Sequence, residues 1–301
     1  MCINHFFMKK ITLTLLSLFC MAAGALFSCS SSGALTKGTT EEPVETPKEE
    51  DRPAEKLTAV FLADTQIGYY DSNNSYTQDS LNFELAVNKI NQICPDFVVV
   101  NGDMTNTSSS AKQLACFWSV MKKVNSDIPV WYVPGNHDIG SGSKDAKIES
   151  YINEFGYDRF TFTKGQNTFI GINSCIIKDE RSELAEEQLR WLKRALRESK
   201  KKQHKTYIIC HHPFFINSYG EKVTYSNQSQ EIRDQYWSIF KEFGVTAVFA
   251  GHVHNDAVST YNGIDMITVG PVTKALGDGT SGFAVCDFEN EGYKYEYIPF
   301  K

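Results

Sequence analysis

Five short, mostly apolar stretches of this chain each run into a loop of polar and charged residues. The stretches are residues 57–62, 96–100, 129–133, 207–210 and 245–250. Their length and near-continuous apolar character predict strands buried on both faces, as in a parallel sheet covered by helices. Because the carboxyl ends of parallel strands meet at one edge of a sheet, we expect the five loops to converge on one crevice. This pattern restricts the chain to an α/β fold with its chemistry at that edge.

Amphipathic segments alternate with these stretches. Helices are predicted over residues 79–93, 111–124, 144–155, 183–199 and 229–243, and further short strands over residues 160–162, 168–173, 257–261, 264–269, 282–288 and 293–298. In the first helix, Leu81, Leu85, Ile90 and Ile93 are expected to form the buried face. The first half alternates strand and helix, whereas the C-terminal part is rich in strands. We therefore expect two packed sheets flanked by helices in one domain.

The loops carry residue types that bind hard divalent cations, and they hold five of the seven histidines of the chain. Their polar residues are Asp64, Asn101-Gly102-Asp103, Gly135-Asn136-His137-Asp138, His211-His212 and Gly251-His252-Val253-His254. No Cys-x-x-Cys pair occurs in the sequence, so a zinc–thiolate site is not expected. Carboxylates, imidazoles and an Asn carbonyl suit a pair of divalent ions, which can activate water and clamp a phosphate ester.

In order and spacing, these motifs resemble those of the calcineurin-like metallophosphoesterases, from residue 57 to the C-terminus. The resemblance is carried mainly by Gly-Asn-His-Asp at 135–138 and Gly-His-Val-His at 251–254. It implies an α/β fold arranged as a four-layer α/β/β/α sandwich with a dinuclear centre. It also implies hydrolysis of phosphomonoesters or phosphodiesters by in-line attack of a metal-activated hydroxide, without a covalent phosphoenzyme. The two divalent metal ions could be Mn, Mg, Fe or Zn.

The same resemblance assigns roles to individual residues. By this resemblance, the first metal would be held by Asp64 and His254, and the second metal by Asn136, His211 and His252. Asp103 would bridge both metals, because a carboxylate offers two oxygens. Of the adjacent pair His211 and His212, the first is the expected ligand, because it lies two places before Pro213.

Three further positions carry expectations. His137 would not bind metal; it would contact the phosphoryl oxygen or protonate the leaving oxygen. Asp138 would not bind metal itself but would help to orient a residue that does. Asn106 stands where some relatives have an acidic residue that supports this histidine. The aromatic and polar loop 214–230 is either part of the substrate cleft or a surface loop.

Gln66 departs from the family pattern, in which a metal-binding histidine stands two places after the first aspartate. Three interpretations remain open. The amide oxygen of Gln66 could bind the first metal, which would favour Mg²⁺, Mn²⁺ or Fe over Zn²⁺. Gln66 could instead bind a metal-bound water, or the first site could be only partly occupied. The family branch with Asp-Pro-Gln at this motif is similar here and includes active protein phosphatases.

The N-terminal segment has the features of an export signal. A basic pair, Lys9-Lys10, precedes a mostly apolar stretch that is short for a membrane span, which is typical of a secretory signal peptide. We expect this signal peptide over residues 1–28, with Met8 as an alternative start. Leu-Phe-Ser-Cys at 26–29 resembles a bacterial lipobox, so Cys29 is the expected lipidation site. A plain secreted protein and an uncleaved anchor are the alternatives.

Residues 29–56 are rich in Ser, Thr, Glu, Lys and Pro, which predicts a disordered lipoprotein tether. The phosphoesterase domain is expected over 57–301. The resulting expectation is a membrane-anchored lipoprotein of the cell envelope that faces the periplasm or the exterior. The net charge is −6 and no basic stripe is present, so no nucleic acid partner is expected.

The substrate class is left open at this stage. A phosphorylated small molecule and a phosphorylated macromolecule both suit the chemistry, and neither ester preference nor oligomeric state follows from the sequence. Two other functions compete with simple ester hydrolysis. One is a non-catalytic lipoprotein that binds phospho-ligands on a degenerate scaffold, and the other is a hydrolase of nucleotide or lipid pyrophosphates.

Overall fold

The computed structural model describes residues 56–108, 110–140, 145–178, 183–289 and 291–300. The predicted signal peptide over 1–28, Cys29 and all of the tether but its last residue lie outside the described residues. Among the helices that are described, none is long and apolar enough to cross a bilayer.

The first of two sheets contains the first predicted strand. It consists of β1 (Leu57–Leu62), β2 (Phe97–Val100), β3 (Val130–Tyr132), β10 (Gly282–Glu289) and β11 (Gly292–Pro299), in the order β11-β10-β1-β2-β3. β1, β2 and β3 are parallel, with Val60 opposite Val98 and Val98 opposite Val130. β10 runs antiparallel to both of its neighbours. The loops after β1, β2 and β3 therefore leave the sheet at the same edge.

The second sheet holds the remaining strands. These are β4 (Phe160–Lys164), β5 (Asn167–Gly171), β6 (Lys205–Ile209), β7 (Val245–Ala250), β8 (Ala257–Tyr261) and β9 (Ile264–Thr268), in the order β4-β5-β6-β7-β9-β8. The four central strands β5, β6, β7 and β9 are parallel, and β4 and β8 pair antiparallel at the two edges. The loops after β6 and β7 thus also share one edge, as the sequence predicts.

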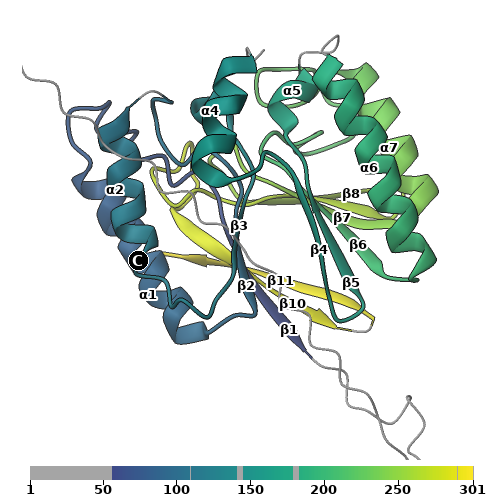
Figure 1. Cartoon of the computed structure of the whole chain (residues 1–301), viewed down its shortest axis with the longest axis horizontal. Coiled ribbons are helices and arrows are strands. Elements are labelled where there is room, and N and C mark those ends of the chain that lie inside the picture. The colour runs from purple at the N-terminus through teal and green to yellow at the C-terminus, as the bar shows by residue number, and fades with distance from the viewer. Residues whose placement is uncertain (1–55, 109, 141–144, 179–182, 290, 301) are drawn as a thin grey trace, which may run out of the picture. The chain divides into compact units, whose positions relative to one another are not determined.

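Helices cover the outer faces of both sheets (Figure 1). α1 (Thr77–Ile93) and α2 (Ala111–Met121) pack on the first sheet, where Phe83 and Phe117 contact the β1 and β2 side chains. α6 (Glu183–Lys201) and α7 (Gln230–Phe243) pack on the second sheet through residues such as Leu192 and Phe240. The shorter helices are α3 (Asn136–Ile139), α4 (Asp145–Phe155) and α5 (Ser174–Lys178). The mixed α/β class with two sheets is confirmed.

A third apolar cluster fills the space between the sheets. Strand residues alternate between faces, so Val60 points to the helices whereas Ala59 and Phe61 point to the second sheet. The Phe61 ring stacks on Phe249 of β7, with centroids 4.4 Å apart and planes 11° from parallel. With the two helical layers outside, the packing order is the expected helix, sheet, sheet and helix. The two inner faces hold the ends of β1 and β7 close to each other.

The buried face of α1 differs from the prediction. Ile90 is buried as predicted, together with Phe83 and Val87, whereas Leu81 and Leu85 are each 49% exposed. The prediction is wrong at these two residues because the buried face also carries polar residues. These are Asp79, which accepts hydrogen bonds from Gly68 N and Thr273 Oγ1, and Asn82, which donates to Val272 O. Polar residues with partners distant in the sequence do not appear in an apolar periodicity.

The stack between the sheets gives a stability prediction. Replacing Phe249 with alanine removes a fully buried ring and its contact with Phe61. The free energy of unfolding should fall by about 3–5 kcal/mol, measured by urea denaturation of residues 51–301. Leu85→Ala on the exposed side of α1 is the control and should change stability by less than about 0.5 kcal/mol. Equal losses in the two variants would contradict both the core assignment and the corrected helix face.

Candidate metal centre

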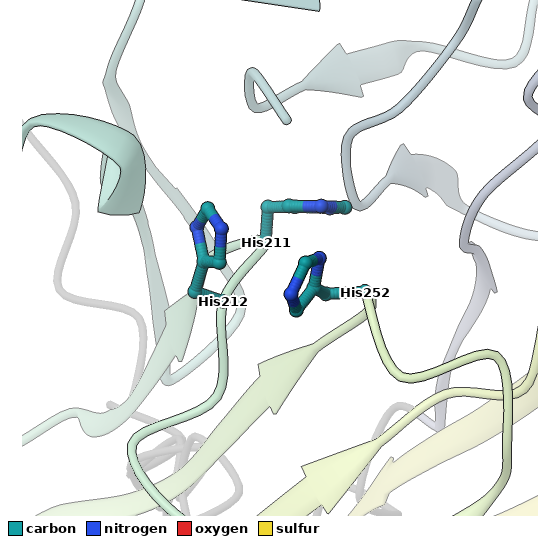
Figure 2. Close-up of side chains that lie close together, drawn as sticks. All are labelled: His211, His212 and His252. Carbon is teal, nitrogen blue, oxygen red and sulfur yellow. The ribbon is translucent and has the colours of Figure 1, made fainter. Parts of the chain in front are cut away.

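The loops that follow β1, β2, β6 and β7 meet at one place although they come from two sheets. Asp64, Asp103 and His211 bring one ligand atom each to within 4.8 Å of one another. A second such group is formed by His211, His212 and His252, whose rings lie together in Figure 2. A hydrogen bond joins the two sheets directly, from His252 N to Asp64 Oδ2 at 2.9 Å. His211 belongs to both groups, so the two sets of ligands adjoin each other.

The backbone at this site has an uncommon conformation. Ten described non-glycine residues have a positive φ, and half of them are candidate site residues: Asp64 (50°), Gln66 (31°), Asp103 (52°), His252 (71°) and His254 (52°). Such angles are rare for residues with a Cβ and cost energy. Their concentration here indicates that the loops are held in shape to aim side chains and not only to connect elements.

Asp103 lies at the centre of the candidate ligands. Its Oδ1 accepts a hydrogen bond from His137 N at 2.7 Å, and its Oδ2 lies 3.2 Å from His211 Nε2. Burial opposes ionisation of this carboxyl, but the charges and hydrogen bonds of the two histidines outweigh burial and lower its pKa to about 2. Asp103 is therefore an ionised carboxylate, which is the form that a bridging ligand requires.

His211 is oriented by hydrogen bonds on both of its nitrogens. Nδ1 donates to the Asn101 carbonyl oxygen at 2.8 Å, and Nε2 lies 3.1 Å from Asn136 Oδ1 as well as near Asp103. A ring whose Nδ1 proton is held by a carbonyl presents Nε2 to a cation. Burial opposes a charge on this ring, but the Asp103 carboxylate outweighs burial and raises its pKa to about 9. Binding of a cation at Nε2 would therefore displace a proton.

The remaining histidine motif also fits cation binding. His254 donates from Nδ1 to the Lys274 carbonyl oxygen at 2.8 Å, and its Nε2 lies 3.4 Å from Asp64 Oδ1. Within the described part of the chain, that carboxylate oxygen is buried without a hydrogen-bond partner. Burial and the charge of His211 lower the pKa of His252 to about 3, so this ring is neutral, as a metal ligand must be. The unpartnered carboxylate oxygen and the neutral ring suit a bound cation.

Gln66 lies at the same site, buried beside Asp103. Its backbone N–H donates to the Asp103 carbonyl oxygen at 2.8 Å, and its side-chain Nε2 donates to Asn106 Oδ1 at 3.2 Å. The other end of the amide, Oε1, is buried, and no described residue donates to it. A buried carbonyl oxygen without a donor calls for an ion or a water. The donor set of carboxylates, imidazoles and amide oxygens therefore fits two divalent cations.

His137 and Asp138 take different positions from the ligands. His137 Nδ1 donates to the backbone carbonyl oxygen of Asn106 at 2.8 Å, so its support comes from the main chain and not from the Asn106 side chain. Asp138 accepts from Gly135 N at 2.9 Å and from Met104 N at 3.0 Å, which ties the loop after β3 to the loop after β2. Burial and the charge of Asp103 raise the pKa of Asp138 to about 7.

His212, which the sequence favours less than its neighbour, is also buried at this site. Its ring centroid lies 4.3 Å from that of His252, and its Nδ1 lies 3.3 Å from Ser174 Oγ. That hydroxyl also accepts from the backbone N–H groups of His211 (3.1 Å) and His212 (2.8 Å). Only His211 of the pair contacts Asp103 and Asn136, so proximity to the other ligands favours it. The Ser174 hydroxyl holds the backbone that separates the two rings.

Two residues at the site were not predicted individually. The Tyr225 hydroxyl accepts from Asn136 Nδ2 at 3.0 Å, and its carbonyl oxygen lies 3.4 Å from His252 Nε2. Lys178 at the end of α5 holds this loop through donation to the Tyr225 carbonyl oxygen at 3.0 Å. Loop 214–230 therefore contacts the site. The aromatic residues of this loop were a sequence signal that could have indicated Tyr225. No such signal marks Lys178, because α5 is too short to give a periodic pattern.

Comparisons with known proteins relate this chain to phosphoesterases. A family model described as calcineurin-like phosphoesterase matches residues 57–256. The chain is 32% identical to serine/threonine-protein phosphatase CPPED1 of Bos taurus over 219 residues, which is 70% of each chain. A dimetal phosphatase from Danio rerio has a similar fold, with a TM-score of 0.60, 17% identity and coverage of 81% of this chain and 99% of that one. The Plasmodium inner membrane complex anchor GAP50 is similar in fold at a TM-score of 0.61 and 18% identity, covering 81% of this chain and 84% of its own.

The close contact between Gly135 and Asp103 allows the site to be tested without changing a ligand. A Cβ at residue 135 would lie 2.1 Å from Asp103 Oδ1 and 2.3 Å from Asp103 N, so Gly135→Ala must displace the carboxylate. Affinity for Mn²⁺ in the chelator-stripped protein should fall by at least about tenfold, measured by isothermal titration. Gly220→Ala is the matched control, since a Cβ there meets no described heavy atom within 4 Å. Equal Mn²⁺ affinity in the two variants would contradict the central position of Asp103.

Proposed function

We propose that this chain, a phosphoric ester hydrolase that belongs to the calcineurin-like phosphoesterase family, acts through a dinuclear centre held by its strand-end loops. The observation that supports this most is the position of His211 Nε2, which lies 3.2 Å from Asp103 Oδ2 and 3.1 Å from Asn136 Oδ1. Ligand atoms from three different loops are thus aimed at one point. In this proposal Asp64, Gln66 and His254 would hold the first cation, His211, Asn136 and His252 would hold the second, and Asp103 would serve both.

The cations, when bound, would supply Lewis-acid activation of water and neutralise charge on the phosphoryl group. The chain itself supplies orientation and proton transfer. Because His137 Nδ1 donates to the Asn106 carbonyl oxygen, its Nε2 is the atom available to a phosphoryl or leaving-group oxygen. Asp138 keeps the loop that carries Asn136 and His137 fixed against the loop that carries Asp103. The geometry suits delivery of a proton to a leaving oxygen next to the centre.

The substrate class proposed is a phosphate monoester. The similarity to proteins named serine/threonine-protein phosphatase supports it, because the shared region covers 70% of both chains. Fold similarity alone does not decide between a catalyst and a binding protein, since one fold serves many functions. A panel of aryl phosphomonoester, aryl phosphodiester, phosphoserine peptide and pyrophosphate, assayed with Mn²⁺, Mg²⁺ or Zn²⁺ after chelation, separates the possibilities. Retained phosphate binding without any turnover would favour the non-catalytic alternative.

A conservative change at the central carboxylate tests the catalytic proposal. Asp103→Asn keeps the size of the side chain but removes its charge and one acceptor oxygen. Turnover should fall by at least roughly 100-fold, because even partners of metal ligands contribute 10–100-fold. Asp127→Asn makes the same chemical change at an exposed position and should leave turnover unchanged. Full hydrolysis by a folded Asp103→Asn protein would refute the proposed centre.

We further propose that the domain is tethered to the cell envelope through a lipid on Cys29. The lipobox-like sequence at 26–29 and the polar segment that follows it support this proposal. In cells that lipidate such signals, the wild-type protein should partition into the detergent phase of a Triton X-114 extract and Cys29→Ser into the aqueous phase. Cys20→Ser, inside the predicted signal peptide, is the control and should partition as wild type. Aqueous partitioning of the wild-type protein would rule out the anchor.

A further inference from the structure

Among the described residues, the side-chain amide of Gln66 has a hydrogen-bond partner for its nitrogen but none for its oxygen. Its Nε2 donates to Asn106 Oδ1 at 3.2 Å, while its buried Oε1 receives no hydrogen bond from the described residues. The free oxygen can serve a cation only if the amide does not turn over, since the opposite orientation would present an NH₂ group. What fixes the orientation of this amide therefore decides whether residue 66 can be a ligand.

A chain of amide side chains leads from Gln66 to a backbone N–H. Asn106 Nδ2 donates to Asn73 Oδ1 at 3.0 Å, and Gln113 Nε2 donates to the same oxygen at 2.7 Å. Gln113 Oε1 in turn accepts from Thr107 N at 2.8 Å. Gln113 and Asn106 each use the oxygen on one side and the nitrogen on the other, whereas Asn73 accepts from both neighbours through the same oxygen, Oδ1. The orientation of each amide therefore determines the orientation of the next.

The direction of the chain is set at the Thr107 end. A backbone N–H can only donate, so the atom of Gln113 that faces it must be the oxygen, and Gln113 must donate to Asn73 from its nitrogen. Asn106 must then turn its nitrogen to Asn73 and its oxygen to Gln66. Gln113 is 2% exposed and lies in the first turn of α2, where its own N–H donates to the capping Ser110 Oγ. The fixed end of the chain is therefore well anchored.

Gly68, two places after Gln66, leaves the space that this chain occupies. A Cβ at residue 68 would lie 2.5 Å from Gln113 Nε2 and 2.9 Å from Asn73 Oδ1. The glycine also has φ +103°, a conformation that side chains rarely adopt. Its N–H donates to Asp79 Oδ2 at 2.9 Å, and its carbonyl oxygen accepts from Asn73 N at 2.7 Å, which brings Asn73 back toward Gln113.

We infer that Gln113, Asn73 and Asn106 form an amide relay that fixes Gln66 Oε1 as an oxygen ligand of the first divalent cation. The inference rests on the proposed function, because it assumes that a cation binds beside Asp64 and Asp103. The three residues of the relay are positioning residues: they act through Gln66. The relay fixes an oxygen toward the site, where it could bind the cation or accept from a metal-bound water, and the inference takes direct ligation.

Two amide-to-carboxylate changes within the relay have opposite expected effects. Gln113→Glu still accepts from Thr107 N but has no proton for Asn73, so Asn73, Asn106 and Gln66 each turn over and an NH₂ group faces the cation. Asn73→Asp keeps an acceptor oxygen for both of its donors and leaves the direction unchanged. Both variants add one negative charge near the site, which by itself would strengthen cation binding. A loss of Mn²⁺ affinity that occurs only in Gln113→Glu is therefore caused by the reversed direction of the amide hydrogen bonds and not by the added charge.

The measurement is titration of Mn²⁺ into chelator-stripped protein by calorimetry, with thermal unfolding of the metal-free proteins as the check on folding. Gln113→Glu should weaken one of two Mn²⁺ sites by roughly 10–100-fold, and Asn73→Asp should bind Mn²⁺ at least as tightly as wild type. The double variant Gln113→Glu/Gln66→Glu should recover the site, because a carboxylate offers an oxygen in either orientation. If the second substitution restores Mn²⁺ affinity, the loss in Gln113→Glu comes from the turned amide of Gln66 and not from a general disturbance of the site.

Unchanged Mn²⁺ affinity in a folded Gln113→Glu protein, or equal losses in Gln113→Glu and Asn73→Asp, would overturn the relay. If Gln113→Glu does not fold, the exposed residue 73 provides the test. Asn73 has a φ of +69°, which glycine adopts without strain, so Asn73→Gly removes the link but leaves the backbone undisturbed. This variant should weaken one Mn²⁺ site, whereas Asn73→Asp should not. Wild-type Mn²⁺ affinity in Asn73→Gly would also overturn the relay. Failure of the proposed function is distinct, since wild type itself would then bind fewer than two Mn²⁺ or hydrolyse no ester.

Discussion

Packing between the two sheets is the constraint on which the site depends. Phe61 and Phe249 stack between the sheets, and just beyond the ends of the same two strands His252 N donates to Asp64 Oδ2. An apolar contact and a polar contact thus hold the ends of β1 and β7 together. The proposed ligands to each cation come from loops of both sheets, so a change in the distance between the sheets would alter the distances between ligands of different sheets. The aromatic core therefore helps to set the geometry of the proposed metal centre.

The metal centre is a site of unfavourable local energy in the absence of cations. It combines left-handed backbone at five residues with buried oxygens on Asp64 and Gln66 to which no described residue donates a hydrogen bond. Burial and repulsion from the Asp103 carboxylate also raise the pKa of Asp138. Cations that neutralise this charge would stabilise the folded chain by mass action. The fold must therefore hold the loops in place against their own repulsion, through the backbone hydrogen bonds that join them.

The sequence predicts the strands, the helices and the candidate ligands better than it predicts their surroundings. Apolar strands that end in Asp64, Asp103 or His211 are local patterns, so they are visible in one dimension. The predicted buried face of α1 is right at Ile90 and wrong at Leu81 and Leu85. The true face includes Asp79 and Asn82, which have hydrogen-bond partners nearly two hundred positions away. Tyr225 and Lys178 reach the site only through tertiary contacts, and the relay through Asn73 and Gln113 requires knowledge of which amide atom faces which. Such information exists only once the chain is folded.

The short helix α5 has a mechanical consequence. At its first residue, Ser174 holds the backbone of the paired histidines after β6, and at its last residue, Lys178 holds the carbonyl of Tyr225 in loop 214–230. A single helical turn therefore connects the histidine loop to loop 214–230. Thermal displacement of α5 would move His211 and Tyr225 in the same direction, so the distance between the two loops would vary less than the position of either loop.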